Sequence, residues 1–242
     1  MSESQSSSKI DLSIVIPAYN EEKRIGRYLQ SIRNHFKKSH LKIEIIVVDD
    51  GSKDRTAVIA KKSGAKVFTN NPNRGKGYSV KRGMGLAKGN VILFADADGA
   101  TPITEADKFL RLIESGNDVV IASRSIKGAK LVKKQPWHRM FVGKTFRLLT
   151  VVVTGLEFYD TQCGFKMFSK KAAKKVFPKQ TIDRWGFDPE ILFIAKKYKF
   201  KIKETPVSWH DQAGSKVSPI KDGIKMLGEL VKVRWNAICG QY

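Results

Sequence analysis

The chain has 242 residues, of which 41% are hydrophobic, so it can build one large α/β domain with a substantial core. Its net charge of +22, from 45 Lys and Arg against 23 Asp and Glu, predicts a polyanionic partner: nucleic acid, an anionic membrane or a phosphorylated substrate. The two distant cysteines argue against a disulfide framework and fit a reducing compartment, and without a run of 18 apolar residues no transmembrane helix is expected.

The first half of the chain alternates between apolar runs and helical patterns. Residues 1–10 are polar and serine-rich and are predicted to be a disordered lead. The predicted strands are Leu12–Pro17, Ile43–Val48, Ala65–Thr69, Val91–Ala95 and Asp118–Ala122. The predicted helices are Glu21–Lys38, one capped by Ser52, Gly75–Lys88 and Ile103–Glu114. This alternation predicts an α/β fold with a doubly wound, mostly parallel sheet.

Polar residues follow the predicted strands, and ligands of such sheets bind beyond the carboxyl ends of the strands. These polar groups are Asn20-Glu21, Asp49-Asp50, Asn73-Arg74, Asp96 with Asp98, and Ser123-Arg124. They are therefore expected to converge on one crevice. Asp96-Ala97-Asp98 is the most informative group, because two carboxylates just past a strand can hold a hard divalent cation. Such a cation commonly neutralises a pyrophosphate.

The second half is richer in aromatic residues and carries basic amphipathic segments. Its predicted elements are a mixed aromatic and aliphatic stretch Trp137–Leu156, a helix Phe187–Tyr198, a strand Ile202–Val207 and a basic amphipathic helix Ile220–Ile238. No Cys and His spacing suggests a zinc site.

Several motifs together resemble the family 2 inverting glycosyltransferases, which have a GT-A fold. The motifs are Ile16–Glu22, Val48–Ser52, Arg74–Gly77, Asp96–Thr101, Asp160–Lys166 and Arg184–Asp188. Within that family the pattern looks most similar to the dolichyl-phosphate β-glucosyltransferases, and less so to the dolichyl-phosphate mannose synthases. The mannose synthases typically have Gln where this chain has Ala100, which leaves the third metal ligand open and argues against GDP-mannose.

The resemblance implies roles for individual residues. Asp98, with Asp96 sharing the ion or touching the sugar or ribose, would bind Mg²⁺ or Mn²⁺. Arg124 and Lys216 would contact the diphosphate, Gln162 would face the sugar, and Asp188 would be the candidate general base. The nucleotide would be bound by Pro17, Ala18, Tyr19, Glu21, Asp49, Asp50, Asp96 and Lys76.

Plainer interpretations of the same residues stay open at this point. Asp188 could be a helix-start carboxylate favoured by the helix dipole, and Asp49 could only stabilise a turn. Arg124 could be a surface arginine, and Lys216 could be an ordinary loop residue. Cys163 is expected to be a packed residue, because inverting transfer needs no covalent enzyme intermediate.

The implied reaction moves a hexose, expected to be glucose, from a UDP-sugar to a polyprenyl or dolichyl monophosphate with inversion. Residues 11–218 would form the GT-A domain, with a nucleotide-sugar half over 11–125 and an acceptor half over 126–218, followed by a C-terminal amphipathic helix over 219–242. The enzyme alternatives are transfer to a saccharide hydroxyl and a GDP-mannose-using synthase.

A nucleic-acid-binding protein is the alternative from another class, and the scattered basic residues and clustered carboxylates argue against it. The basic amphipathic segments would instead hold the protein peripherally on the cytoplasmic face of a membrane, beside its lipid acceptor.

Overall fold

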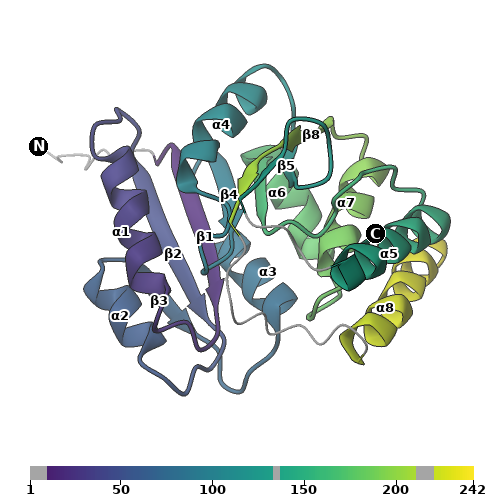
Figure 1. Ribbon diagram of the computed structural model, residues 1–242, viewed down its shortest axis with the longest axis horizontal. Coiled ribbons are helices and arrows are strands. Elements are labelled where there is room, and N and C mark those ends of the chain that lie inside the picture. The colour runs from purple at the N-terminus through teal and green to yellow at the C-terminus, as the bar shows by residue number, and fades with distance from the viewer. Residues whose placement is uncertain (1–9, 133–136, 211–220) are drawn as a thin grey trace, which may run out of the picture.

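The structure is a computed structural model that describes residues 10–132, 137–210 and 221–242 (Figure 1). Within these residues, seven strands form one sheet in the order β3-β2-β1-β4-β7-β5-β8, while β6 and β9 pair separately. The strands are β1 (Leu12–Ala18), β2 (Ile43–Asp49), β3 (Lys66–Thr69), β4 (Val91–Ala95), β5 (Val119–Ser123), β6 (Lys130–Leu131), β7 (Phe165–Ser169), β8 (Ile202–Pro206) and β9 (Ser208–Trp209).

Helices cover both faces of the sheet and bury two apolar layers against it. One face carries α1 (Ile25–Phe36), α2 (Thr56–Lys62), the 3₁₀ turn η1 (Ile103–Glu105) and α4 (Ala106–Glu114). The other face carries α3 (Lys76–Leu86), α6 (Lys170–Val176), the 3₁₀ turn η2 (Phe177–Lys179) and α7 (Phe187–Lys197). Helix α1 illustrates this packing, because its buried residues lie on one face of the helix and form a single stripe. They are Ile25, Tyr28, Leu29, Ile32 and Phe36.

Two long helices, α5 (Trp137–Thr154) and α8 (Lys221–Ile238), pack on each other and on α7 at one end of the molecule. They lie together at the right-hand edge of the view in Figure 1, far from α1 and α2. Within residues 10–132, 137–210 and 221–242, no helix is long and apolar enough to cross a bilayer.

The predicted α/β fold with a mostly parallel sheet is confirmed, and the five predicted strands of the first half end within one residue of the observed ones. The first helix begins at Ile25 and not at Glu21, because residues 22–24 form a turn held by the Glu21 side chain. The predicted cap at Ser52 is wrong. Helix α2 begins at Thr56, and Ser52 Oγ accepts a hydrogen bond from the Asn20 amide instead.

Strand β7 is the one strand of the seven-stranded sheet that the sequence pattern did not predict. It lies between β4 and β5 and is antiparallel to both, with Ala95 opposite Phe165. Because β7 runs against its neighbours, the loop that precedes it reaches the carboxyl end of β4. This insertion brings residues 160–164 beside the acidic Asp96–Asp98 loop.

Candidate active site

Two acidic side chains follow β4 at the carboxyl edge of the sheet, Asp96 and Asp98, with the buried Ala97 between them. The Asp96 amide donates to the carbonyl oxygen of Gly164 at 2.9 Å, and the Ala100 amide donates to Asp98 Oδ1 at 3.0 Å. Burial, reinforced by the neighbouring Asp96, raises the pKa of the Asp98 carboxyl. The negative charge of Asp98 is therefore only partly compensated by the surrounding protein.

Lys76 forms an ion pair with this acidic loop. It is the first residue of α3, and its Nζ lies 2.7 Å from Asp96 Oδ1 and 5.6 Å from the centroid of the Trp185 ring. Burial disfavours the ammonium, but Asp96 and Asp188 outweigh burial, so the pKa of Lys76 is raised. Lys76 thus remains charged and holds Asp96 in place.

Glycine is required directly before Lys76. Gly75 has a φ of +105°, and a Cβ there would lie 2.5 Å from the carbonyl oxygen of Asp183. Any larger residue would push α3 and its first lysine away from the acidic loop.

Asp96 and Asp98 supply the carboxylate oxygens that Mg²⁺ and Mn²⁺ prefer. The described residues contain no group of three or more His, Cys, Asp or Glu that could hold a metal ion. A divalent cation here would therefore take its other ligands from a diphosphate, from water or from backbone oxygens. The incompletely compensated Asp98 fits such a cation, because a metal ion would offset the burial penalty that raises its pKa.

Asp50 directly follows β2, and hydrogen bonds from a neighbouring loop fix its side chain. Its carboxylate accepts from Asn70 Nδ2 at 2.7 Å, from the Arg74 amide at 3.0 Å and from the Gly75 amide at 2.7 Å. Asp50 thus organises the turn that leads into α3. Asp49 is also buried and accepts from the Ser52 amide at 3.3 Å.

The segment after β1 is linked to the acidic loop through the charge of Arg24. Pro17 does not end the strand: it lies opposite Val48, and β1 continues through Ala18. The Glu21 carboxylate accepts from Arg24 Nε at 2.7 Å and from Arg24 Nη2 at 2.8 Å. Burial opposes the charge on Arg24, but Glu21, Asp98 and Asp96 together raise its pKa. The charge of Arg24 therefore couples the segment that contains Glu21 to the acidic loop. Tyr19, which is half-buried, belongs to the same segment.

Arg124 follows β5 and is held by a buried carboxylate rather than free on the surface. Its Nε and Nη2 donate to the two oxygens of Asp160 at 2.7 and 2.9 Å. Burial opposes ionisation of Asp160, but Arg124 outweighs burial, so the pKa of Asp160 is lowered. This two-point contact orients the guanidinium of Arg124. The backbone amide of Gln162 donates to the same Asp160 carboxylate at 3.3 Å.

Asp188 pairs with a buried lysine that comes from β7. Lys166 is 0% exposed and Asp188 is 3% exposed, and Lys166 Nζ donates both to Asp188 Oδ1 and to the Cys163 carbonyl oxygen. Burial raises the pKa of Asp188, although Lys166 and Lys76 oppose the shift. Cys163 itself is buried, and burial raises the pKa of its thiol to about 12, as expected for a packed residue.

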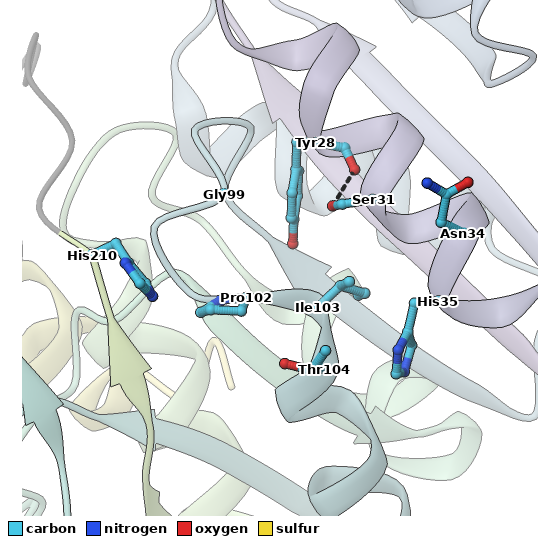
Figure 2. A pocket seen from close by; sticks show the side chains of 9 residues that line it. All are labelled: Tyr28, Ser31, Asn34, His35, Gly99, Pro102, Ile103, Thr104 and His210. Atoms are coloured by element: carbon cyan, nitrogen blue, oxygen red, sulfur yellow. Dashed lines mark hydrogen bonds between the residues drawn. The ribbon is translucent and has the colours of Figure 1, made fainter. Parts of the chain in front are cut away.

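A cavity of about 620 Å³ opens beside the acidic loop, between α1 and η1. Figure 2 shows the Tyr28 ring beside Gly99, with His210 across the opening. A Cβ at Gly99 would lie 2.8 Å from the Tyr28 ring, so the ring packs directly under the acidic loop. The His210 amide donates to the Ala100 carbonyl oxygen at 2.8 Å, which fixes the other side of that loop.

The structure thus brings Asp96, Asp98 and Lys76 together, with Asp188 and Arg124 close enough to influence their charges. Lys216 lies outside the described residues. Asp160, the partner of Arg124, and Lys166, the partner of Asp188, were not predicted as site residues, although both belong to the Asp160–Lys166 motif. Their spacing from Arg124 and Asp188 gave no pairing signal, because the contacts form only through the insertion of β7.

The profile of the family described as Glycosyl transferase family 2 matches residues 13–177 of this chain. The chain is a family 2 glycosyltransferase. It is 36% identical to a dolichyl-phosphate β-glucosyltransferase of Dictyostelium discoideum, over 96% of this chain and 76% of the relative. It is 34% identical to the Homo sapiens protein of the same name, over 96% of this chain and 77% of that protein.

Solved structures confirm the fold of this glycosyltransferase. Mannosyl-3-phosphoglycerate synthase from Rubrobacter xylanophilus superposes with a TM-score of 0.72 at 19% identity, covering 96% of this chain and 76% of that one. Glucosyl-3-phosphoglycerate synthase from Mycobacterium tuberculosis, solved with Mn²⁺, UDP-glucose and phosphoglyceric acid, gives 0.70 at 18% identity, covering 96% and 80%. At these identities the likeness concerns the GT-A fold alone.

Gly164→Ala is expected to lower the transferase activity about 100-fold. A Cβ at this position would lie 2.0 Å from Asp96 Oδ2, so the carboxylate or its loop must move, and displacements near 1 Å cost about this much. Steady-state transfer rates measure the effect. Gly85→Ala is the matched control, because nothing lies within 4 Å of its added methyl group. Full activity of Gly164→Ala would show that the observed position of Asp96 is unimportant.

Proposed function

We propose that this glycosyltransferase moves glucose from UDP-glucose to a dolichyl-type polyprenyl monophosphate, with inversion at the anomeric carbon. The observation that carries the proposal is similarity over nearly the whole chain to proteins named dolichyl-phosphate β-glucosyltransferase, at 36% and 34% identity. The site supports it, because carboxylates and cations meet at one sheet edge, as a sugar diphosphate requires.

In this reaction an acceptor phosphate oxygen attacks C1 of glucose while the bond from C1 to the UDP oxygen breaks. A phosphate monoester has a second pKa near about 6, so it is largely ionised at neutral pH and needs no strong base. The enzyme then has to orient the two substrates and to stabilise the departing diphosphate. Asp188 fits this requirement as the partner of Lys166, which anchors the loop before β7, rather than as a general base.

Asp96 and Asp98 are the proposed holders of Mg²⁺ or Mn²⁺, which would supply positive charge to the diphosphate. Mn²⁺ together with UDP-glucose in the similar Mycobacterium tuberculosis synthase supports this assignment. Lys76 holds Asp96, and Arg124 and Lys216 are the proposed further cations for the leaving group, with Gln162 facing the sugar. The nucleotide would lie along the loops after β1 and β2, which contain Pro17, Ala18, Tyr19, Glu21, Asp49 and Asp50.

The acceptor class also sets the proposed place of action. A polyprenyl phosphate is embedded in a bilayer, so the enzyme would work at a membrane surface. The cytoplasmic face is the proposed side, because Cys163 and Cys239 are free thiols, as in proteins of reducing compartments.

Transfer of radiolabel from sugar nucleotides into a polyprenyl phosphate tests the proposal. With Mn²⁺ present, UDP-glucose should label the lipid at least about tenfold faster than GDP-mannose, and EDTA should stop the reaction. Calorimetry should show tighter binding of UDP than of GDP. A preference for GDP-mannose would overturn the donor assignment, and labelling of a saccharide hydroxyl instead of the lipid would overturn the acceptor assignment.

A further inference from the structure

Exposed apolar side chains gather on α5 and α8. Of the eleven large hydrophobic residues that are exposed in the described part of the chain, six lie on these two helices. Large apolar side chains concentrated on one surface of a soluble domain mark an interaction site. The six residues are Leu148, Val152, Leu227, Val231, Trp235 and Ile238.

Helix α8 has two apolar faces, and only one of them is used by the fold. Its inner face buries Met226, Leu230 and Val233 against the domain. Its outer stripe, which includes Val231 and Trp235, recurs at spacings of four, four and three residues from Leu227 to Ile238 and so forms one continuous line. Val231, Trp235 and Ile238 are 60%, 64% and 70% exposed. The outer stripe is therefore not needed to bury the core.

Helix α5 extends this surface. Leu148 and Val152 lie four residues apart on one exposed face, 63% and 72% accessible, and α5 packs on α8. The two helices lie side by side at one end of the molecule (Figure 1).

The charge around the apolar stripe is positive. Lys225, Lys232 and Arg234 are exposed on α8. The sequence of α5 contains three Lys or Arg and no Asp or Glu, and the whole chain carries +22. An apolar stripe with basic flanks is the pattern that places a helix in the interface of an anionic bilayer.

We propose that the outer faces of α5 and α8 form one surface that binds an anionic phospholipid bilayer, with both helices lying in the plane of the interface. The proposal builds on the proposed function, since a lipid acceptor requires a bilayer. The positive charge favours this occupant over a second copy of the chain, because two such surfaces would repel each other.

The inner face of α8 links this surface to the site. Glu229 Oε2 accepts a hydrogen bond at 2.7 Å from the backbone amide of Gly186, which lies two residues before Asp188 in the sequence. Gln162 Nε2 lies 3.9 Å from Met226 Sδ. The helix proposed to contact lipid thus also contacts the two segments that carry Gln162 and Asp188.

Sedimentation with vesicles, without donor or acceptor, tests the surface directly. The full chain should co-sediment with phosphatidylcholine vesicles containing phosphatidylserine, less with phosphatidylcholine alone, and less at high salt. Val231→Ser combined with Trp235→Ser should weaken binding at least about fivefold without changing the melting temperature. Val58→Ser combined with Leu86→Ser, at exposed apolar positions of α2 and α3, is the matched control and should bind as the wild type does.

Three results would contradict the proposal that this surface binds a bilayer. These are no binding to anionic vesicles at low salt, binding that the α8 variant leaves unchanged, and sedimentation equilibrium showing a dimer that the α8 variant disperses. A second assay distinguishes failure of the membrane surface from failure of the proposed function. It measures transfer to a short-chain polyprenyl phosphate dissolved in water, which needs no bilayer. If the α8 variant retains that transfer but loses vesicle binding, both proposals are supported; if the wild type lacks transfer but binds vesicles, only the proposed function fails.

Discussion

Asp98→Asn should lose transferase activity by about 100- to 1,000-fold or more while its melting temperature stays the same or rises. The activity falls because one of the two carboxylates proposed to hold the cation is gone. The stability behaves differently because burial raises the pKa of Asp98 in the folded protein. A carboxyl with a raised folded-state pKa costs folding free energy whenever it is ionised, and Asn removes that cost.

The sign of this effect also fixes its pH dependence. The stability gain of Asp98→Asn should be largest near neutral pH and should shrink as the pH falls toward the pKa of the carboxyl, where wild-type Asp98 becomes protonated. Thermal melts across pH measure it, and melts with Mn²⁺ and UDP should show ligand stabilisation in the wild type only. Asp107→Asn, at a half-exposed carboxylate on α4, is the control. An active Asp98→Asn variant, or one that Mn²⁺ and UDP still stabilise, would contradict the assignment.

Lys166→Met is expected to destabilise the fold by about 3–5 kcal/mol, because it leaves a buried carboxylate without its partner. Lys166 is fully buried, and its ammonium serves both Asp188 and the Cys163 carbonyl oxygen. Urea denaturation monitored by circular dichroism gives the change in the free energy of unfolding. Lys174→Met, at an exposed position of α6, is the control and should lie within about 0.5 kcal/mol of the wild type.

The double variant separates a broken pair from a poorly packed side chain. Lys166→Met combined with Asp188→Leu removes both charges, so it should be more stable than Lys166→Met alone. A Lys166→Met protein as stable as the wild type, or a double variant no more stable than Lys166→Met, would contradict a stabilising pair between Lys166 and Asp188.

The strands of the first half were predictable because a parallel sheet buried on both faces requires continuous apolar runs. Val91–Ala95 is such a run, and the observed β4 has the same limits. Strand β7 was not predictable in this way, because Lys166 interrupts its apolar pattern and its buried charge is balanced by Asp188, which lies 22 residues away. A one-dimensional pattern cannot show that distant compensation.

The candidate site likewise has features that local sequence predicts and features that depend on tertiary structure. Asp96 and Asp98 were identifiable because their residue type and spacing are local features and the apolar run of β4 ends directly before Asp96. The pairings of the predicted Lys76 and Arg124 were not identifiable, since Lys76 reaches Asp96 through the packing of α3, and Arg124 reaches Asp160 across the inserted strand. Such ion pairs depend on tertiary structure, and local sequence patterns do not show which distant residues come into contact.

The insertion of β7 also has a consequence for biosynthesis. Strands β4 and β5 leave the ribosome before β7, yet β7 lies between them, so the middle of the sheet cannot close while the chain ends at Ser123. Until Phe165–Ser169 has been translated, both earlier strands have an unpaired edge, which is open to pairing with other nascent chains. Closure of the sheet is thus a late, long-range event, and the acidic loop after β4 acquires its final shape only when that strand arrives.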